Sequence, residues 1–511
     1  MPDAAHTPVI VGVGEVKDQP QDRATGQEPA ALIETALRRA QLDAGADAGA
    51  NLLARLDSLD VVNVISWPYD DLPGLLAERL GAGPGWRRHG EIGGHTPVQF
   101  LHEAASRIAR GEASVAAVCG GEATHTATWA RRTGTSLGWT QPHTPVQTGT
   151  DWLPARNRDY IHPLARAHGV TEPITVYPLY ETAVQALWGQ TPEEGRAESA
   201  ALGSALSAIA AGNPTAWIRA RHDPQAISAM GPANRPVAWP YSKLMVANPA
   251  VNQAGAILLT SLEVARAAGI PEERLIYLHA GAAASEPRDW MARPRLDGCP
   301  AQDAVLKAML EASGGVAPTI CELYTCFPVV PKMARRVLGL PATTPISVTG
   351  GLTFHGAPFN STMVHAAAMM VRRLREAAHE AGGRGLLYGQ GGHLTSHHAL
   401  LLGRDTAPPG AMLRPYDRNA AAAARRQPAP AIAIDTLGAA RLEAFTVLFN
   451  PDGTAAHGTA VVRLADGART LGRVPAEDGA TLARLMADGV VPIGHMGRLT
   501  RGTGPLLRWV A

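Results

Sequence analysis

The chain has 511 residues, of which 46% are hydrophobic and 18% charged, as is ordinary for a globular protein with a large core. At about 100–200 residues per domain, this length predicts two to four domains. The net charge of +1 argues against nucleic acid as a partner of the main body, because polyanions are bound by strongly basic surfaces.

The sequence carries no sign of export or of a membrane span. It has no run of about 20 apolar residues, and its polar start, Met1–Pro8, lacks the features of a signal peptide. None of the four cysteines shows paired metal-ligand spacing: Cys119, Cys299, Cys321 and Cys326. We therefore expect a reduced, cytoplasmic protein without disulfides.

Strands alternate with helices in the first quarter of the chain. The apolar runs Pro8–Gly14, Leu59–Ile65 and Val115–Cys119 are typical of buried strands. Residues 29–42 carry apolar side chains at helical spacing, and Pro97–Gly111 is a predicted helix with Thr96 as its cap. This alternation predicts an α/β fold around a buried sheet.

Residues 126–245 interrupt this pattern with short stretches rich in Pro, Trp and Tyr. We interpret them as an inserted, partly helical region that shapes a pocket. The α/β pattern then returns, with strands predicted at Gly255–Ser261, Leu275–His279, Ile320–Leu323 and Gly385–Tyr388. The second half thus repeats the kind of units present in the first, as a pattern rather than as sequence identity.

The C-terminal region differs in composition. Residues 405–431 are rich in Pro, Ala and Arg and predict a linker, and residues 432–511 carry short strands with hairpin turns between them. The strands are predicted at Leu442–Phe449, Gly458–Leu464 and Thr470–Val474, and the turns at Asn450–Gly453 and Ala465–Gly467. A small β-barrel or meander is the expected structure.

Four segments of the main body carry recognisable motifs. They are Asn248–Ser261 (NPAVNQAGAILLTS), Glu322–Phe327 (ELYTCF), Gly350–Pro358 (GGLTFHGAP) and Gly389–Leu402 (GQGGHLTSHHALLL). In this order they resemble segments of the thiolase superfamily. Within that superfamily they are most similar to the thiolase-like proteins of the sterol-carrier-protein type. The resemblance spans about residues 7–404, and the part from about 432 is similar to an extra β domain found on some bacterial thiolase-like proteins.

The resemblance implies a five-layered α/β/α/β/α thiolase fold with two similar βαβ halves, followed by a small C-terminal β-barrel-like domain. Residues 1–125 and 246–265 are expected to form the N-terminal half, and residues 266–404 the C-terminal half. Residues 126–245 would be the inserted loop and helical region, residues 405–431 the linker, and residues 432–511 the extra domain.

A thiolase needs a cysteine thiolate at a helix N-terminus, a histidine that activates it, a second acid/base group and donors for the thioester oxygen. The resemblance places the nucleophile at Gly94 and the histidine of the Gly-His-Pro motif at Ala357. The histidine of the His-Asp-Cys-Phe motif falls on Tyr324, and the second cysteine would fall near Tyr388–Gln390, where none exists. The usual machinery is therefore replaced at each expected point.

The candidate catalytic residues are Tyr324, His355 and His393. Tyr324 could donate a hydrogen bond to a carbonyl or act as a base with a lowered pKa, or it could be a packing residue. His355 lies two residues before Ala357, and histidine is the readiest acid/base group near neutral pH. Cys326, the cysteine of the same motif, is expected to be a buried, inert thiol.

The predicted binding residues are Gly93, Gly94, His95, Gly356, Asn360, Gly391 and His397. The amides at Gly93 and Gly94 could face an anion or a thioester oxygen at a helix N-terminus, or the two glycines could only form a tight turn. Asn360 is alternatively a helix cap. His393 and His397 are expected to line a pocket, and no metal site is predicted, because this stretch lacks an HExxH pattern.

Three functions stay open. The first is a thiolase-like, nominally acyltransferase protein of lipid or sterol-type metabolism that acts on a coenzyme A thioester without the cysteine nucleophile. The second is a retro-aldol carbon–carbon lyase acting on a β-hydroxyacyl-CoA, for which tyrosine and histidine suffice. The third is a non-catalytic acyl-CoA binding or scaffold protein. The expected partner is a small-molecule acyl-CoA, with no covalently bound cofactor, and a homo-oligomer or a partner subunit stays open.

Overall fold

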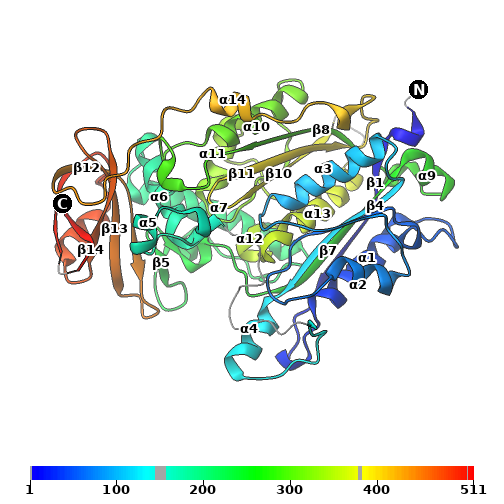
Figure 1. Ribbon diagram of the computed structural model, residues 1–511, viewed down its shortest axis with the longest axis horizontal. Helices are drawn as coiled ribbons and strands as arrows, with labels where there is room; N and C mark the ends of the chain where they lie inside the picture. Colours follow the sequence, from blue (N-terminus) through cyan, green and yellow to red (C-terminus); the bar gives the residue numbers. More distant parts are fainter. Residues whose placement is uncertain (1–2, 144–156, 378–382, 503) are drawn as a thin grey trace.

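The computed structural model describes residues 3–143, 157–377, 383–502 and 504–511. Part of the predicted insertion, residues 144–156, and the first two residues lie outside the described residues. The described part forms a nine-stranded sheet covered by helices and a seven-stranded sheet at the C-terminal end of the chain (Figure 1). None of its helices is both long enough and apolar enough to cross a membrane.

The first half of the large sheet contains five strands in the order β3-β2-β4-β7-β1. Strand β2 runs parallel to β3 and β4, whereas β7 runs antiparallel to both β4 and β1. The strands are β1 (Pro8–Lys17), β2 (Ser58–Val61), β3 (Trp86–His89), β4 (Val115–Ala123) and β7 (Asn252–Ser261). Except for β3, they are buried at nearly every position, as is typical of a sheet covered on both faces.

The second half of the sheet repeats the topology of the first. Its strands are β8 (Ile276–Ser285), β9 (Ile320–Glu322), β10 (Arg384–Gly391) and β11 (Ser396–Gly403). Their order β8-β11-β10-β9 matches β1-β7-β4-β2, and the parallel and antiparallel pairings match as well. The halves join where Val9 and Ile10 of β1 pair with Tyr277 and Ile276 of β8. The two similar halves predicted from the sequence are confirmed.

Helices form three layers around the two half-sheets. Helices α1 (Pro29–Ala44) and α10 (Pro300–Ala312) cover the outer faces of the first and second half. Helices α3 (Thr96–Ala109) and α13 (Thr362–Glu376) lie side by side between the halves and contact both of them (Figure 1). Both central helices are buried around most of their circumference, as a helix enclosed by two sheets must be.

The predicted insertion is largely helical where it is described. Its elements are α4 (Thr124–Thr133), α5 (Pro163–Ala167), α6 (Pro173–Leu187), α7 (Pro192–Gly212), α8 (Pro224–Ser228), β5 (Pro236–Ala238) and β6 (Tyr241–Ser242). A fully buried ion pair between Lys332 and Glu181 ties α6 to α11 (Val329–Leu338), and the Tyr241 hydroxyl donates to Glu181 at 2.7 Å. These polar contacts fix the insertion against the second half.

The remaining helices are short. They are α2 (Leu72–Leu80), α9 (Leu262–Ala267), α12 (Gly351–Phe354), α14 (Asn419–Ala423) and α15 (Gly479–Leu485). Helix α14 lies in the segment predicted as a linker and packs on α10 and β8, where Arg426 pairs with Glu286 at 2.8 Å.

The C-terminal strands form a closed five-stranded barrel. Its strands are β12 (Gly438–Phe449), β13 (Ala455–Arg463), β14 (Arg469–Pro475), β15 (Met496–Arg501) and β16 (Leu507–Val510). Their order is β13-β14-β16-β15-β12, and pairing of β12 with β13 closes the ring. Buried Phe445, Val447, Val462 and Trp509 fill its interior. Pairing of Leu448 with Ala238 adds β5 and β6 to the barrel sheet, and the predicted β-barrel is confirmed.

Several element boundaries differ from the sequence expectation, and those of β1 and β2 bear on the site. Strand β1 continues past Gly14 to Lys17 and places Glu15 in the interior, because Arg372 and His365 compensate its charge. Strand β2 ends at Val61: the Val62 amide still donates to the Cys119 carbonyl of β4 at 2.8 Å, and the amides of Ile65 and Ser66 then bind the Glu122 carboxylate.

Candidate functional site

The start of the central helix α3 carries three of the predicted binding residues. The Gly93 amide donates to Asn360 Oδ1 at 2.9 Å, and the Asn360 amide donates in turn to the Asn63 carbonyl at 3.1 Å. The interpretation of Asn360 as a helix cap is therefore wrong, because its side chain binds two segments of the other half. Within the described part of the chain, the amides of Gly94 and His95 have no hydrogen-bond acceptor. They are two free donors at the positive end of a helix dipole.

Tyr324 occupies the space that a nucleophile at position 94 would need. A β-carbon on Gly94 would lie 1.8 Å from the Tyr324 hydroxyl oxygen and 2.6 Å from the Gln390 carbonyl oxygen. Tyr324 follows β9 and has φ of 53°, a left-handed conformation that costs energy in a residue other than glycine. The structure thus brings two predicted site residues together. Tyr324 fits here only because position 94 has no side chain, and a side chain at position 94 would clash with the Tyr324 hydroxyl.

The protonation state of Tyr324 limits its chemistry. Burial raises the pKa of Tyr324 well above its usual value, and the neighbouring Cys326 acts in the same direction. The phenol is therefore neutral at physiological pH. Its hydroxyl makes no hydrogen bond to the described residues, which leaves it available as a donor to a ligand carbonyl. A role as hydrogen-bond donor is supported, whereas a role as base is not.

The end of β10 packs directly against the start of α3. A β-carbon on Gly391 would lie 2.4 Å from His95 Nδ1 and 3.1 Å from the Gly93 α-carbon. Glycine at position 391 is therefore required by this close approach. Burial lowers the pKa of His95 to about 4, so its ring is neutral at pH 7. His95 keeps part of its surface accessible, unlike the other predicted histidines.

His393 and His397 lie in the wall behind this loop. The His393 carbonyl accepts from Arg293 and from the Tyr180 hydroxyl, and burial lowers the pKa of its ring to about 3. His397 Nδ1 is 2.6 Å from the Tyr388 hydroxyl, and its Nε2 is 3.3 Å from Cys299 Sγ. Both side chains are almost fully buried, and their roles in catalysis and binding stay predictions.

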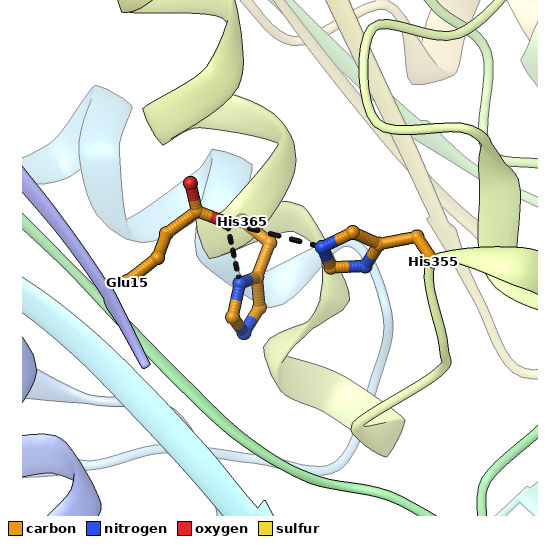
Figure 2. Close-up of side chains that lie close together, drawn as sticks. All are labelled: Glu15, His355 and His365. Carbon is orange, nitrogen blue, oxygen red and sulfur yellow. Dashed lines mark hydrogen bonds and ion pairs between the residues drawn. The ribbon is translucent and has the colours of Figure 1, made fainter. Parts of the chain in front are cut away.

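His355 and Gly356 lie in a different cluster. His355 Nε2 is 3.9 Å from Glu15 Oε1, and His365 Nδ1 approaches the same oxygen to 2.8 Å (Figure 2). Although burial raises the pKa of Glu15, the hydrogen bond of His365 and the nearby positive charges lower it to about 2. No described hydrogen bond or ring contact joins His355 to Tyr324. The sequence missed Glu15 and His365, because they are 350 residues apart and neither lies in a motif.

The four cysteines, at positions 119, 299, 321 and 326, are buried and free. Burial raises the pKa of Cys299, Cys321 and Cys326 to about 12 and that of Cys119 further. Cys326 contacts the Gln390 amide at 3.2 Å, as fits the inert thiol expected there. None of these thiols is a thiolate at neutral pH, so none is an activated nucleophile.

Comparison with known proteins agrees with this geometry. Residues 421–502 match the family model described as the thiolase-like protein type 1 additional C-terminal domain. The fold is that of the thiolase superfamily, with a C-terminal barrel. In particular, the chain is similar to a monomeric SCP2-thiolase like protein type 1 from Mycobacterium smegmatis, with 26% identity, full coverage of both chains and a TM-score of 0.79. The recognition of a thiolase-like protein of the sterol-carrier-protein type with an extra β domain is confirmed.

Two further structures share the main body alone. The Ltp2-ChsH2(DUF35) aldolase is 18% identical over 78% of this chain and 98% of its own, with a TM-score of 0.58. The Acat5 thiolase from Ascaris suum was solved in complex with coenzyme A. It is 14% identical over 78% of this chain and 99% of its own, with a TM-score of 0.54. A search among curated proteins gave no match. The thiolase fold thus covers the chain up to the C-terminal barrel.

Proposed function

We propose that the protein binds a coenzyme A thioester at the start of α3 and cleaves a carbon–carbon bond by a retro-aldol reaction, without an acyl-enzyme. The observation that carries this proposal is the Tyr324 hydroxyl in the space of the missing nucleophile. A covalent thiolase cannot be built here, whereas a neutral phenol and two free amides remain as donors. Such donors stabilise an enolate oxygen without a covalent bond.

The proposed ligand follows from the same donors and from the fold. The thioester carbonyl would accept from Tyr324 and from the amides of Gly94 and His95, where the helix dipole favours negative charge. A thiolase-fold structure solved with coenzyme A supports a coenzyme A thioester as the ligand, and we propose that its acyl group is of the lipid or sterol type.

The proposed reaction needs one proton acceptor. A base removes the β-hydroxyl proton, the Cα–Cβ bond breaks, a carbonyl compound leaves, and the thioester enolate takes a proton at Cα. We assign the acceptor role to His95, because its imidazole is neutral and partly accessible beside Gly93 and Gly391. His393 and His355 are buried, and His355 lies in the separate cluster with Glu15 and His365.

The test compares two substrates with mass detection of the products. With a β-hydroxyacyl-CoA we expect a shortened acyl-CoA and a carbonyl compound in equal amounts. With acetoacetyl-CoA plus free coenzyme A we expect no acetyl-CoA. Acetyl-CoA formation in the second reaction would overturn the proposal. No product from either, together with calorimetric binding of the thioester, would instead favour the non-catalytic binding protein.

Tyr324→Phe separates the role of the hydroxyl from that of the ring. The variant should lose about 100-fold or more in kcat, since one oxyanion donor contributes about 2.7–4 kcal/mol in characterised enzymes. Tyr416→Phe removes a tyrosine hydroxyl far from the start of α3 and is the matched control. Equal turnover of both variants would remove Tyr324 from the mechanism.

A further inference from the structure

Four polar side chains converge at a point that the proposed reaction does not use. Glu15 comes from β1, Thr215 follows α7, His355 follows α12, and His365 lies on α13. Figure 2 shows the His365 ring below the Glu15 carboxylate and the His355 ring to its right, both directed at the same carboxylate oxygen. The side chains of Glu15, His355 and His365 are at most 1% exposed. Buried polar groups of this kind normally have full sets of partners.

The two imidazoles of this cluster lack such partners. Among the described residues, the shortest hydrogen bonds of the His355 ring nitrogens are 3.4 Å long, to the Gly356 carbonyl and to Thr215 Oγ1. These lengths are at the outer limit of a hydrogen bond. His365 Nε2 is buried and has no hydrogen-bond partner in the described part of the chain. His365 thus faces Glu15 Oε1 through Nδ1 at 2.8 Å, while its Nε2 has no partner among the described residues, and His355 faces the same oxygen through Nε2 at 3.9 Å.

The distances between the donor atoms have the scale of a coordination shell. From Glu15 Oε1, they are 2.8 Å to His365 Nδ1, 3.3 Å to Thr215 Oγ1 and 3.9 Å to His355 Nε2. The candidate ligand atoms of Glu15, His355 and His365 all lie within 4.8 Å of one another. A tetrahedral zinc ion with bonds of about 2.0–2.1 Å places its ligands about 3.3 Å apart. The observed spacings bracket that value.

Two positive groups face the cluster and shape its electrostatics. Arg372 pairs with Glu15 Oε2, which leaves Oε1 directed at the two rings. Lys17 lies nearby and donates to the Ala216 carbonyl at 3.0 Å. Because Arg372 and Lys17 repel an incoming metal cation, only an ion that forms strong bonds with imidazole and carboxylate can bind here. This condition favours a transition metal such as zinc over magnesium or calcium, which prefer oxygen ligands.

We propose that Glu15, His355 and His365 bind one divalent transition-metal ion of the zinc class, with Thr215 beside the fourth position. The ion would connect β1, α13 and the loop after α12. That loop also carries Asn360, which holds Gly93. The site is independent of the proposed lyase reaction, and it is tested without any measurement of activity.

The test uses the full chain after treatment with a chelator. Zinc or cobalt(II) is added, excess metal is removed by gel filtration, and bound metal is measured by mass spectrometry. We expect one equivalent of zinc, a higher Tm in its presence, and with cobalt the intense visible absorption of a four-coordinate ion. Glu15→Gln and His365→Gln should each lose more than tenfold in zinc affinity.

The control is His279→Gln, which removes a buried histidine of β8 outside the cluster and should keep one equivalent of zinc. Magnesium should not be retained by any variant. A wild-type chain that retains no zinc or cobalt overturns the proposal, whatever the variants do. Equal zinc binding by wild type, Glu15→Gln and His365→Gln would also overturn it, because the metal would then bind elsewhere.

Discussion

Gly94 and Tyr324 depend on each other. Glycine is needed at position 94 because the Tyr324 hydroxyl fills the space of a side chain there. Tyr324 in turn holds a left-handed backbone that few bulky residues adopt. Restoring a cysteine alone therefore does not restore a thiolase.

Gly94→Cys should destabilise the protein by about 1–3 kcal/mol, as overpacking of a buried site does. Combined with Tyr324→Ala, the same substitution should cost less than the sum of the two single changes, because the alanine removes the clash with the phenol and leaves only the close approach to the Gln390 carbonyl. Urea denaturation of the wild type, both single variants and the double variant measures this coupling. Strictly additive values would contradict the close contact between the two residues.

At the scale of elements, the C-terminal barrel is tied to the loop that lines the candidate site. Arg469 of β14 is fully buried and pairs with Glu443 at 2.6 Å, and its Nη1 donates to the carbonyls of Met291 and Arg293 at 2.7 and 2.6 Å. The Arg293 guanidinium in turn donates to the carbonyls of His393 and Leu394. A chain of hydrogen bonds thus runs from the barrel to the loop beside His95.

Arg469→Met should lower the free energy of unfolding by about 3 kcal/mol. This is the lower end of the range for breaking a buried ion pair, because Arg463 also contacts Glu443 at 2.6 Å. Chemical denaturation gives the free energy, and faster proteolysis between the main body and the barrel would show that the barrel has loosened. Arg501→Met, which removes the exposed pair with Asp435, is the control and should cost less than about 1 kcal/mol. Equal costs would mean that Arg469 does not hold the barrel in place.

At the scale of the whole molecule, the interior is rich in neutral histidine. Burial lowers the pKa to about 4 for His95, His102 and His355, and to about 3 for His168, His393 and His397. Between these values and the usual 6.5, the unfolded chain binds more protons than the folded one. The contribution of these neutral histidines to the free energy of unfolding is therefore full above about pH 6.5 and is lost as the pH falls toward 4.

Two buried carboxyls act in the opposite direction, since burial raises the pKa of Glu122 and Glu322 to about 7. They bind protons in the folded state between about pH 4.5 and 7, so their contribution falls as the pH rises. Because the histidines outnumber them, the free energy of unfolding should decrease from pH 6.5 to pH 4. Urea denaturation at half-unit pH intervals measures the slope. His168→Gln should make the slope shallower, and a stability that rises with acidification would contradict this account.

The sequence by itself determined the α/β order of the main body, the repeated halves, the barrel strands and the absence of a nucleophile at position 94. These features follow from local patterns of hydrophobicity, turns and short motifs, which report burial and chain reversal. Only the tertiary structure decided that Tyr324 fills the nucleophile's space, that Asn360 binds Gly93, and that His355 joins Glu15 and His365. Such contacts join residues hundreds of positions apart, and no local pattern encodes which side chains meet when two half-sheets close around α3 and α13.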